Sequence, residues 1–268
     1  MAAPGPSRVR VVRVETADLT GDDHERIAKF ISVYTLYERD VLAAALRAAT
    51  YIWLCLDPKG RIVGTTAVRR LRLSAGVAGH VRAPIAVYTS VVAVNPQYRQ
   101  LGLPAVMGLK TYTHERYNAP LTPLYWLAEA VSPAGYLLMA RNLAVFWPRP
   151  GRPVPQRAHE IIAATLAAAG VTRVHRVGDA HIVQEDYPVI ERDQAPDRWS
   201  KNDPDVAFFL RTNPDYWAGA AIVCLTPLNF IAVSRAVGRV AFKVVRRRVF
   251  GRRTGTGEHA INRTSGPG

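Results

Sequence analysis

The sequence predicts an α/β protein built on a mixed sheet, and two observations lead to this prediction. Strand-like and helix-like segments alternate along most of the chain. In addition, the β-branched segment Val87–Val94 runs through the glycine-bearing loop Asn95–Leu103 into the helical segment Ala105–Tyr117. The first N–H groups of a helix have no partner within it, and the helix dipole adds positive charge there. We therefore expect this loop to bind an anion, in particular a pyrophosphate.

The part of the chain before this loop contains a strand, two helices and a hairpin. The helix that follows the loop is inferred from the spacing of Val106, Leu109, Tyr112 and Thr113. The earlier segments are a strand at Arg8–Val14, helices at His24–Tyr34 and about Glu38–Ala49, and a β-hairpin at Tyr51–Leu71. Asp22 or Asp23 is expected to cap the first helix.

The part after the loop continues the alternation. Leu124–Val131 is expected to be a strand, and Ser132 with Pro133 should begin a helix that ends near Asn142. The remaining segments are a helix at Arg157–Ala169, an extended stretch at Thr172–Gln184, a strand at Val206–Leu210, and a helix from about Trp217 to Phe250, broken near Pro227.

Composition and charge limit the classes of protein to which this sequence can belong. Hydrophobic residues make up 49% of the 268 residues, which is enough for a core and excludes a globally disordered chain. The formal charge of +14 is concentrated after Arg235 and suggests an anionic partner. Two cysteines and no apolar leader favour a cytoplasmic protein, with peripheral membrane attachment as an option. P-loop and Rossmann fingerprints are absent from the sequence.

The loop sequence resembles a known family motif. The motif R/Q-x-x-G-x-G/A is similar to Arg99-Gln100-Leu101-Gly102-Leu103-Pro104-Ala105. The pattern V-x-P-x-Y-R, which commonly leads into this motif, is similar to the preceding segment Val94-Asn95-Pro96-Gln97-Tyr98. With the element order, this resembles the GCN5-related N-acetyltransferase (GNAT) superfamily over about Arg8 to Gln184. We divide the chain into a GNAT-like domain at 1–184, a C-terminal extension with a strand and a basic amphipathic helix at 185–250, and a disordered basic tail at 251–268.

The resemblance implies acetyl-CoA or another acyl-CoA as co-substrate, and no metal. The pantetheine arm would pair with the backbone of Val92, Ala93 and Val94. Where the family has its last glycine or alanine, this chain has Pro104, which has no N–H to donate. The pyrophosphate would then be held at Arg99 and by the amides of Gln100, Leu101, Gly102, Leu103 and Ala105.

The resemblance also implies an amine attacking a thioester. Glu129, in the apolar strand segment, is the candidate base, since burial would raise its pKa toward neutrality. The family's tyrosine acid would fall at Met139, which cannot donate a proton, and Tyr136 lies one helical turn earlier. We therefore expect an N-acyltransferase with Glu129 and Tyr136 as catalytic candidates and a small-molecule or protein amine as acceptor.

Two alternatives stay open. The basic face of Arg235, Arg239 and Lys243 could dock an acidic acyl carrier protein as donor, or an anionic membrane surface. In the first case the chain would resemble acyl-amino-acid or acyl-homoserine-lactone synthases. The second alternative is a catalytically degenerate GNAT-like binding protein, with nucleic acid as a partner of the basic tail.

Overall fold

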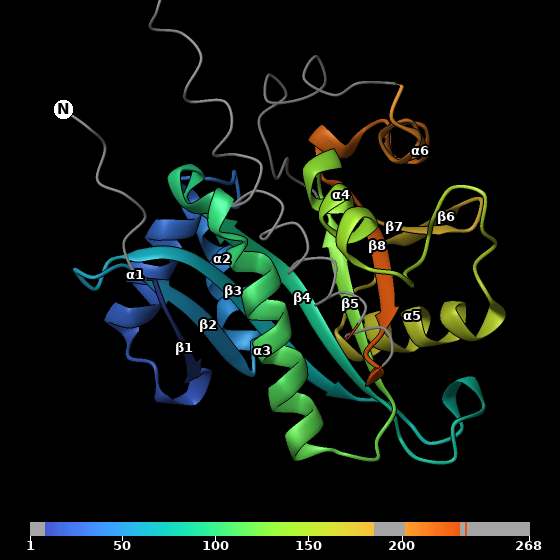
Figure 1. Ribbon diagram of the computed structural model, residues 1–268, viewed down its shortest axis with the longest axis horizontal. Helices are drawn as coiled ribbons and strands as arrows, with labels where there is room; N and C mark the ends of the chain where they lie inside the picture. The colour runs from blue at the N-terminus through green and yellow to red at the C-terminus, as the bar shows by residue number, and fades with distance from the viewer. Residues whose placement is uncertain (1–8, 185–201, 231–233, 235–268) are drawn as a thin grey trace, which may run out of the picture.

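The computed structural model describes residues 9–184, 202–230 and 234 (Figure 1). The strands are β1 (Arg10–Glu15), β2 (Tyr51–Leu56), β3 (Ile62–Arg72), β4 (Ile85–Val94), β5 (Leu124–Ala130), β6 (Val174–Val177), β7 (Ala180–Gln184) and β8 (Ala220–Pro227). The α-helices are α1 (Gly21–Ser32), α2 (Arg39–Ala48), α3 (Leu103–Asn118), α4 (Pro133–Asn142), α5 (Gln156–Ala168) and α6 (Pro204–Thr212).

The described strands form one sheet in the order β1-β2-β3-β4-β5-β8-β7-β6. Neighbouring strands are antiparallel, except that β4 and β5 are parallel. Figure 1 shows that β4 and β5 join two half-sheets, one made of β1–β4 and one made of β5–β8. The predicted mixed α/β sheet is therefore confirmed.

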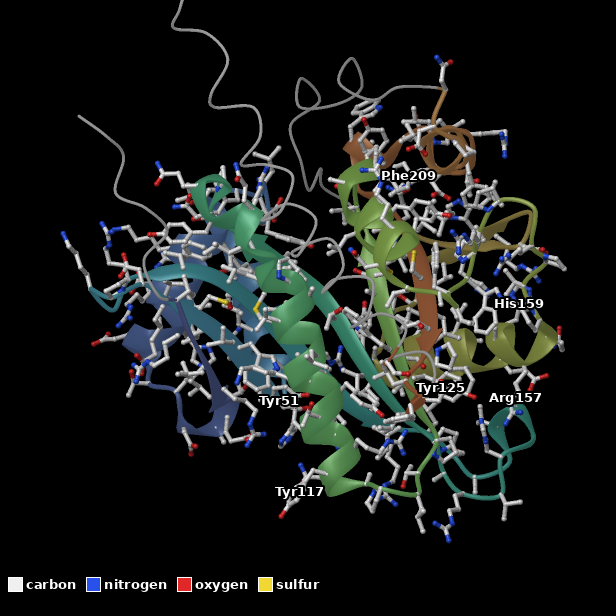
Figure 2. The ribbon with its side chains drawn as sticks, in the orientation of Figure 1. Tyr51, Tyr117, Tyr125, Arg157, His159 and Phe209 are labelled. Atoms are coloured by element: carbon white, nitrogen blue, oxygen red, sulfur yellow. The ribbon has the colours of Figure 1, made fainter. Side chains whose placement is uncertain are left out.

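Helices cover both faces of each half-sheet. On β1–β4, α3 packs through Met107 on one face, whereas α1 and α2 pack through Ile31 and Leu46 on the other. On β5–β8, the α3 face is continued by α4 and α6, where Phe209 lies beside α4 (Figure 2). The opposite face is covered by α5 through Ile161. Each half-sheet therefore has a core on both of its faces.

The buried face of α3 differs from the set of residues whose spacing indicated the helix. Val106 and Leu109 are partly exposed, at 38% and 41% of their surface. The buried positions follow a four-residue spacing, at Leu103, Met107, Thr111 and Glu115. Two of these are polar, so a search for apolar periodicity finds the helix but not the face that it buries.

The first helix begins at Gly21, three residues earlier than predicted. Thr20 is the N-cap of α1, and its hydroxyl accepts a hydrogen bond from the Asp23 amide. Asp23 in turn accepts from the Thr20 amide, which completes a capping box. Asp23 is therefore the third helical residue rather than the cap.

Two predictions in the C-terminal part are wrong. Val206–Leu210, predicted as a strand, lies in α6, because Asp203 caps the helix and Pro204 occupies its first position. Ala220–Pro227, predicted as helix, is strand β8, which pairs with β5 on one side and β7 on the other. A strand in this position is buried on both faces, and its continuous apolar run has no period that separates it from a helix.

The predicted basic helix carrying Arg235, Arg239 and Lys243 lies outside the described residues, as does the tail at 251–268. The carrier-protein, membrane and nucleic-acid hypotheses for these residues therefore stay predictions. Within the part of the chain that the structure describes, no helix combines the length and the apolar character needed to cross a membrane.

Candidate active site

The parallel contact between β4 and β5 is short. It begins at Ile85 opposite Leu124 and ends at Thr89 opposite Ala128. Beyond Thr89, β4 continues to Val94 and pairs with β3, while β5 continues to Ala130 and pairs with β8. Among the described strands, none pairs with the β5-facing edge of β4 over residues 90–94, and the two strands diverge there (Figure 1). This edge presents backbone N–H and C=O groups that a ligand can use.

A β-bulge lies at the point of divergence. Arg69 of β3 is opposite Tyr88, but Ala67 is opposite Val91, so β4 contains one extra residue in this interval. A bulge bends its strand and changes which face the following side chains occupy. As a result, Val91 lies on the same sheet face as Tyr88, and Val92 lies on the α3 face with 45% of its surface exposed.

Glu129 and Tyr88 meet across the end of the β4–β5 contact. Glu129 follows directly after the last paired residue of β5 and is half-buried. The Tyr88 hydroxyl donates a hydrogen bond to a Glu129 carboxylate oxygen. The sequence singled out Glu129, whereas Tyr88 was not assigned a role, because only the bulge and the strand register bring the two together.

The surroundings of Tyr88 keep its hydroxyl protonated. Burial, followed by the charge of Glu129 and the presence of Tyr37, raises the pKa of Tyr88 well above its usual range. Tyr37 comes from the connection between α1 and α2 and is half-buried. Arg69 lies over the Tyr88 ring at 6.0 Å, and its Nη1 donates to the Ala169 carbonyl at 2.8 Å. Tyr88 is thus a hydrogen-bond donor across the neutral pH range.

The predicted pyrophosphate loop forms a 3₁₀ turn, Pro96–Leu101, that leads into α3. Gly102 links the two in the left-handed conformation (φ +67°), which explains why glycine is needed there. Two predicted donors are used within the turn, because Gly102 N–H donates to the Arg99 carbonyl at 3.3 Å and Ala105 N–H donates to the Gly102 carbonyl at 3.0 Å.

The rest of the loop is accessible. Arg99, Gln100 and Leu101 are exposed, and Arg99 makes no ion pair within the described residues. Leu103 anchors the start of α3, since its side chain is buried against the sheet. Its backbone N–H has no hydrogen-bond partner among the described residues. Of the predicted phosphate donors, the amides of Gly102 and Ala105 close the turn, and the Leu103 amide has no partner among the described residues.

Tyr136 lies away from Glu129, in the core between α4 and α6. Its side chain is fully buried against Phe146 and Phe209, and its hydroxyl donates to the Pro148 carbonyl at 3.1 Å. Burial raises the pKa of Tyr136 above its usual range. This hydroxyl therefore already has an acceptor in the core, and a catalytic role for Tyr136 stays a prediction.

The aromatic residues near β5 are also used structurally. Phe146 is buried in the same core as Tyr136. Trp126 donates from Nε1 to Thr89 Oγ1 at 2.9 Å, on the α3 face of the sheet. Tyr125 lies at the other end of β5, where its hydroxyl is 2.7 Å from His80 Nε2 and Arg157 is nearby (Figure 2).

Comparisons with known proteins find similarity at the level of structures only. No protein-family model matches the sequence. No curated protein matches it either. The chain is similar to the GNAT family N-acetyltransferase YhbS from Escherichia coli in complex with CoA, with 12% identity, 50% of this chain and 68% of that chain covered, and a TM-score of 0.35.

Two further solved structures are similar over more of their own length. One is ribosomal-protein-alanine N-acetyltransferase from Brucella melitensis biovar Abortus 2308, with 18% identity, 56% of this chain and 99% of that chain covered, and a TM-score of 0.39. The other is the GphF GNAT-like decarboxylase in complex with isobutyryl-CoA, with 13% identity, 82% of this chain and 100% of that chain covered, and a TM-score of 0.39. The names of two of these structures, YhbS and the GphF decarboxylase, include GNAT.

Proposed function

We propose that this chain is an acyl-CoA-dependent N-acyltransferase that transfers an acyl group from a thioester to an amine. The observation that carries the proposal is the edge of β4 over residues 90–94, with which none of the described strands pairs and which lies directly before the turn and the N-terminus of α3. An extended amide-bearing arm can pair with such an edge as another strand would. Its phosphate end would then reach the loop from Arg99 to Leu103, where the Leu103 amide at the start of α3 and the exposed Arg99 side chain favour an anion.

The side chains at the divergence of the strands fit the chemistry of amine acylation. The co-substrate supplies an activated carbonyl as a thioester. The amine nitrogen would form a bond to this carbonyl carbon, the C–S bond would break, and the thiolate of CoA would leave and take up a proton from solvent. Glu129, half-buried and accepting from Tyr88, would take the proton from the acceptor ammonium so that the nitrogen lone pair can attack. Free N–H groups of β4 would serve as donors to the negative oxygen that develops on the carbonyl.

The acceptor is an amine of a small molecule or a protein that approaches from the α1–α2 side of the sheet. Glu129 and Tyr88 lie on this face, and Tyr37 lies next to them on the α1–α2 connection. A carboxylate flanked by tyrosines suits a cationic amine, because the carboxylate attracts the ammonium and the rings contact its alkyl portion.

The test is calorimetric binding of CoA to the purified full chain and to Gly102→Asp. We expect CoA binding to be lost in Gly102→Asp, because its carboxylate would repel the pyrophosphate. Gly76→Asp is the matched control, since both glycines have positive φ (+67° and +86°) and open space around a Cβ. Absence of CoA binding to the wild-type chain at millimolar concentration, or equal binding by Gly102→Asp, would overturn the proposal.

A further inference from the structure

A second concave site lies at the far end of the β5–β8 half-sheet. Its volume is about 490 Å³, within the range of small-molecule sites. The walls are α6, the turn between β6 and β7, and the segment that precedes α5, on the side of the molecule away from α1 and α2 (Figure 1). None of the residues that line it belongs to the proposed acyl-transfer site.

Three arginines line this cavity, and two of them lie on one tight turn. The sequence Arg149-Pro150-Gly151-Arg152 forms a β-turn in which the Arg152 N–H donates to the Arg149 carbonyl at 3.2 Å. Gly151 supplies the positive φ (+69°) that a turn with proline at its second position requires at its third. The turn therefore holds the backbones of Arg149 and Arg152 next to each other, and Arg211 joins them from α6.

Aromatic rings orient two of the guanidinium groups. Arg149 lies over the Phe146 ring at 5.3 Å, and Arg211 lies over the Phe208 ring at 5.9 Å. Phe208 is itself packed against Tyr136, with 5.7 Å between ring centroids. Stacking on fixed rings restricts a guanidinium. Arg149 Nη2 donates to the Ala140 carbonyl at 3.5 Å, which leaves its other N–H donors for a ligand.

The positive charge of the cavity is not balanced by the described part of the chain. None of the three arginines makes an ion pair there. The cavity has one carboxylate, Asp179, and that group is used elsewhere. Its Oδ2 accepts from the Val154 N–H at 3.2 Å, and its Oδ1 is 3.7 Å from Arg176 Nη2. Three like charges around one cavity repel each other unless an anion lies between them.

We propose that this cavity binds a small organic anion with at least two negative charges, either a phosphate ester or a polycarboxylate. The planar forks of Arg149, Arg152 and Arg211 match the oxygen pairs of both groups. Pro148, Val177 and the Phe208 ring offer apolar surface to the remainder of the molecule. The site is independent of the acyl-transfer proposal because it shares no residue with it.

The experiment measures the affinities of citrate and of inorganic pyrophosphate for the full chain by calorimetry. We expect binding of at least one probe, with Arg152→Gln/Arg211→Gln weakening it about 10-fold or more. Both arginines are exposed, so this variant keeps the fold, which its thermal unfolding curve checks. Arg47→Gln, an exposed arginine on α2, is the matched control and should bind as the wild type does. The tighter probe identifies the anionic group as carboxylate or phosphate.

The loop before α3 could also attract pyrophosphate, so the same titration is made with Gly102→Asp. Pyrophosphate binding that survives in Gly102→Asp and is lost in Arg152→Gln/Arg211→Gln places the anion in the arginine cavity. Binding of neither probe at millimolar concentration, or equal affinities in the wild type and the double variant, would overturn this proposal and leave the acyl-transfer proposal untouched.

Discussion

Two tyrosine–glutamate pairs lie on opposite faces of the sheet, and they differ in what surrounds the carboxylate. Glu115 of α3 is fully buried, accepts from the Tyr51 hydroxyl at 2.9 Å, and forms an ion pair with Arg70 Nε at 2.7 Å. Glu129 of β5 accepts from Tyr88, is half-buried, and lies where two strands diverge.

Two adjacent arginines of β3 lie near the two pairs, one on each face of the sheet. Successive residues of a strand face opposite sides of the sheet. Arg70 therefore reaches Glu115 on the α3 face, whereas Arg69 lies over the Tyr88 ring on the other face and donates to the Ala169 carbonyl. A fully buried carboxylate such as Glu115 stabilises the fold, whereas a half-buried one at a strand end, such as Glu129, is accessible for proton transfer. The surroundings, and not the tyrosine–glutamate pair itself, separate the two roles.

The largest effect expected is a loss of kcat when Glu129, the partner of Tyr88, is changed. Glu129→Gln should lower kcat for acyl transfer about 10²- to 10⁴-fold and change the pH–rate profile, because the base is lost. Its unfolding free energy should stay within about 1 kcal/mol of the wild type, as for a change at a partly exposed site. Steady-state kinetics with acetyl-CoA and a panel of amines provide the measurement. An equal loss of kcat in a folded Glu115→Gln would break the comparison.

At the buried pair of Tyr51 and Glu115, loss of the carboxylate charge should lower the stability of the fold. Glu115→Gln leaves Arg70 without its counter-ion, and the unfolding free energy should fall by about 2–4 kcal/mol. Urea unfolding followed by circular dichroism gives the value. The control is Glu160→Gln on the exposed face of α5, which should change it by less than about 0.5 kcal/mol. A neutral result at Glu115 would mean that the ion pair is not what stabilises α3 on the sheet.

Removing a tyrosine hydroxyl should have smaller effects than removing the charge of its glutamate partner, on kcat at Tyr88 and on stability at Tyr51. Tyr88→Phe removes the donor to Glu129 and should lower kcat about 10-fold, with stability reduced by about 1 kcal/mol. Tyr51→Phe should cost about 1–1.5 kcal/mol of stability and leave kcat unchanged. Parallel kinetics and urea titrations of both variants separate these outcomes. If Tyr51→Phe lowered kcat as much as Tyr88→Phe, the separation of roles would be wrong.

His181 lies 2.9 Å from His159, measured between their ring nitrogens, and it tests how burying a histidine makes the stability of the fold depend on pH. Burial, and then the nearby His159 and Arg176, lower the pKa of His181 to about 4. The unfolded chain, with a histidine pKa near 6.5, binds this proton more readily, so the wild type loses stability as the pH falls below about 6.5. Between pH 7 and pH 5.5 the loss from this group should be about 1 kcal/mol.

The variant His181→Asn should lose correspondingly less stability over this pH interval. The control His175→Asn removes an exposed histidine of the neighbouring strand and should behave as the wild type does. Urea unfolding at pH 7 and at pH 5.5 supplies the comparison. An identical pH dependence in the wild type and His181→Asn would show that this histidine is not the sensitive group.

The sequence predicted the β1–β4 half well, for a local reason. The hairpin at Tyr51–Leu71 has its own turn, and the strand, loop and helix around Gly102 carry local signals for each boundary. The C-terminal part was predicted less well, because β-branched and aromatic residues at Val206–Leu210 outweighed the Asp203-Pro204 start signal of α6. The identity of β8 depends on β5 and β7, which lie far away in the sequence.

The candidate site, too, could be predicted only where local sequence signals place its residues. Glu129 and the loop residues could be chosen from the sequence, since their positions follow from strand and helix boundaries. The partner Tyr88 could not, because its position beside Glu129 depends on the register between β4 and β5, and a bulge adds one residue to β4 between Tyr88 and Val91. The three arginines of the second cavity come from two segments that only the folded β5–β8 half brings together.

The open edge of β4 has a consequence for how the protein avoids unwanted association. A free strand edge at the rim of a sheet can pair with another protein chain and start aggregation. Both rims here carry positive charge, with Arg10 and Arg13 on β1 and Arg176 on β6. The open edge of β4 lies instead in the interior of the sheet order, with the β5–β8 half continuing beyond it (Figure 1). A slender chain without bulky side groups can enter there, whereas a second folded protein cannot bring a strand alongside.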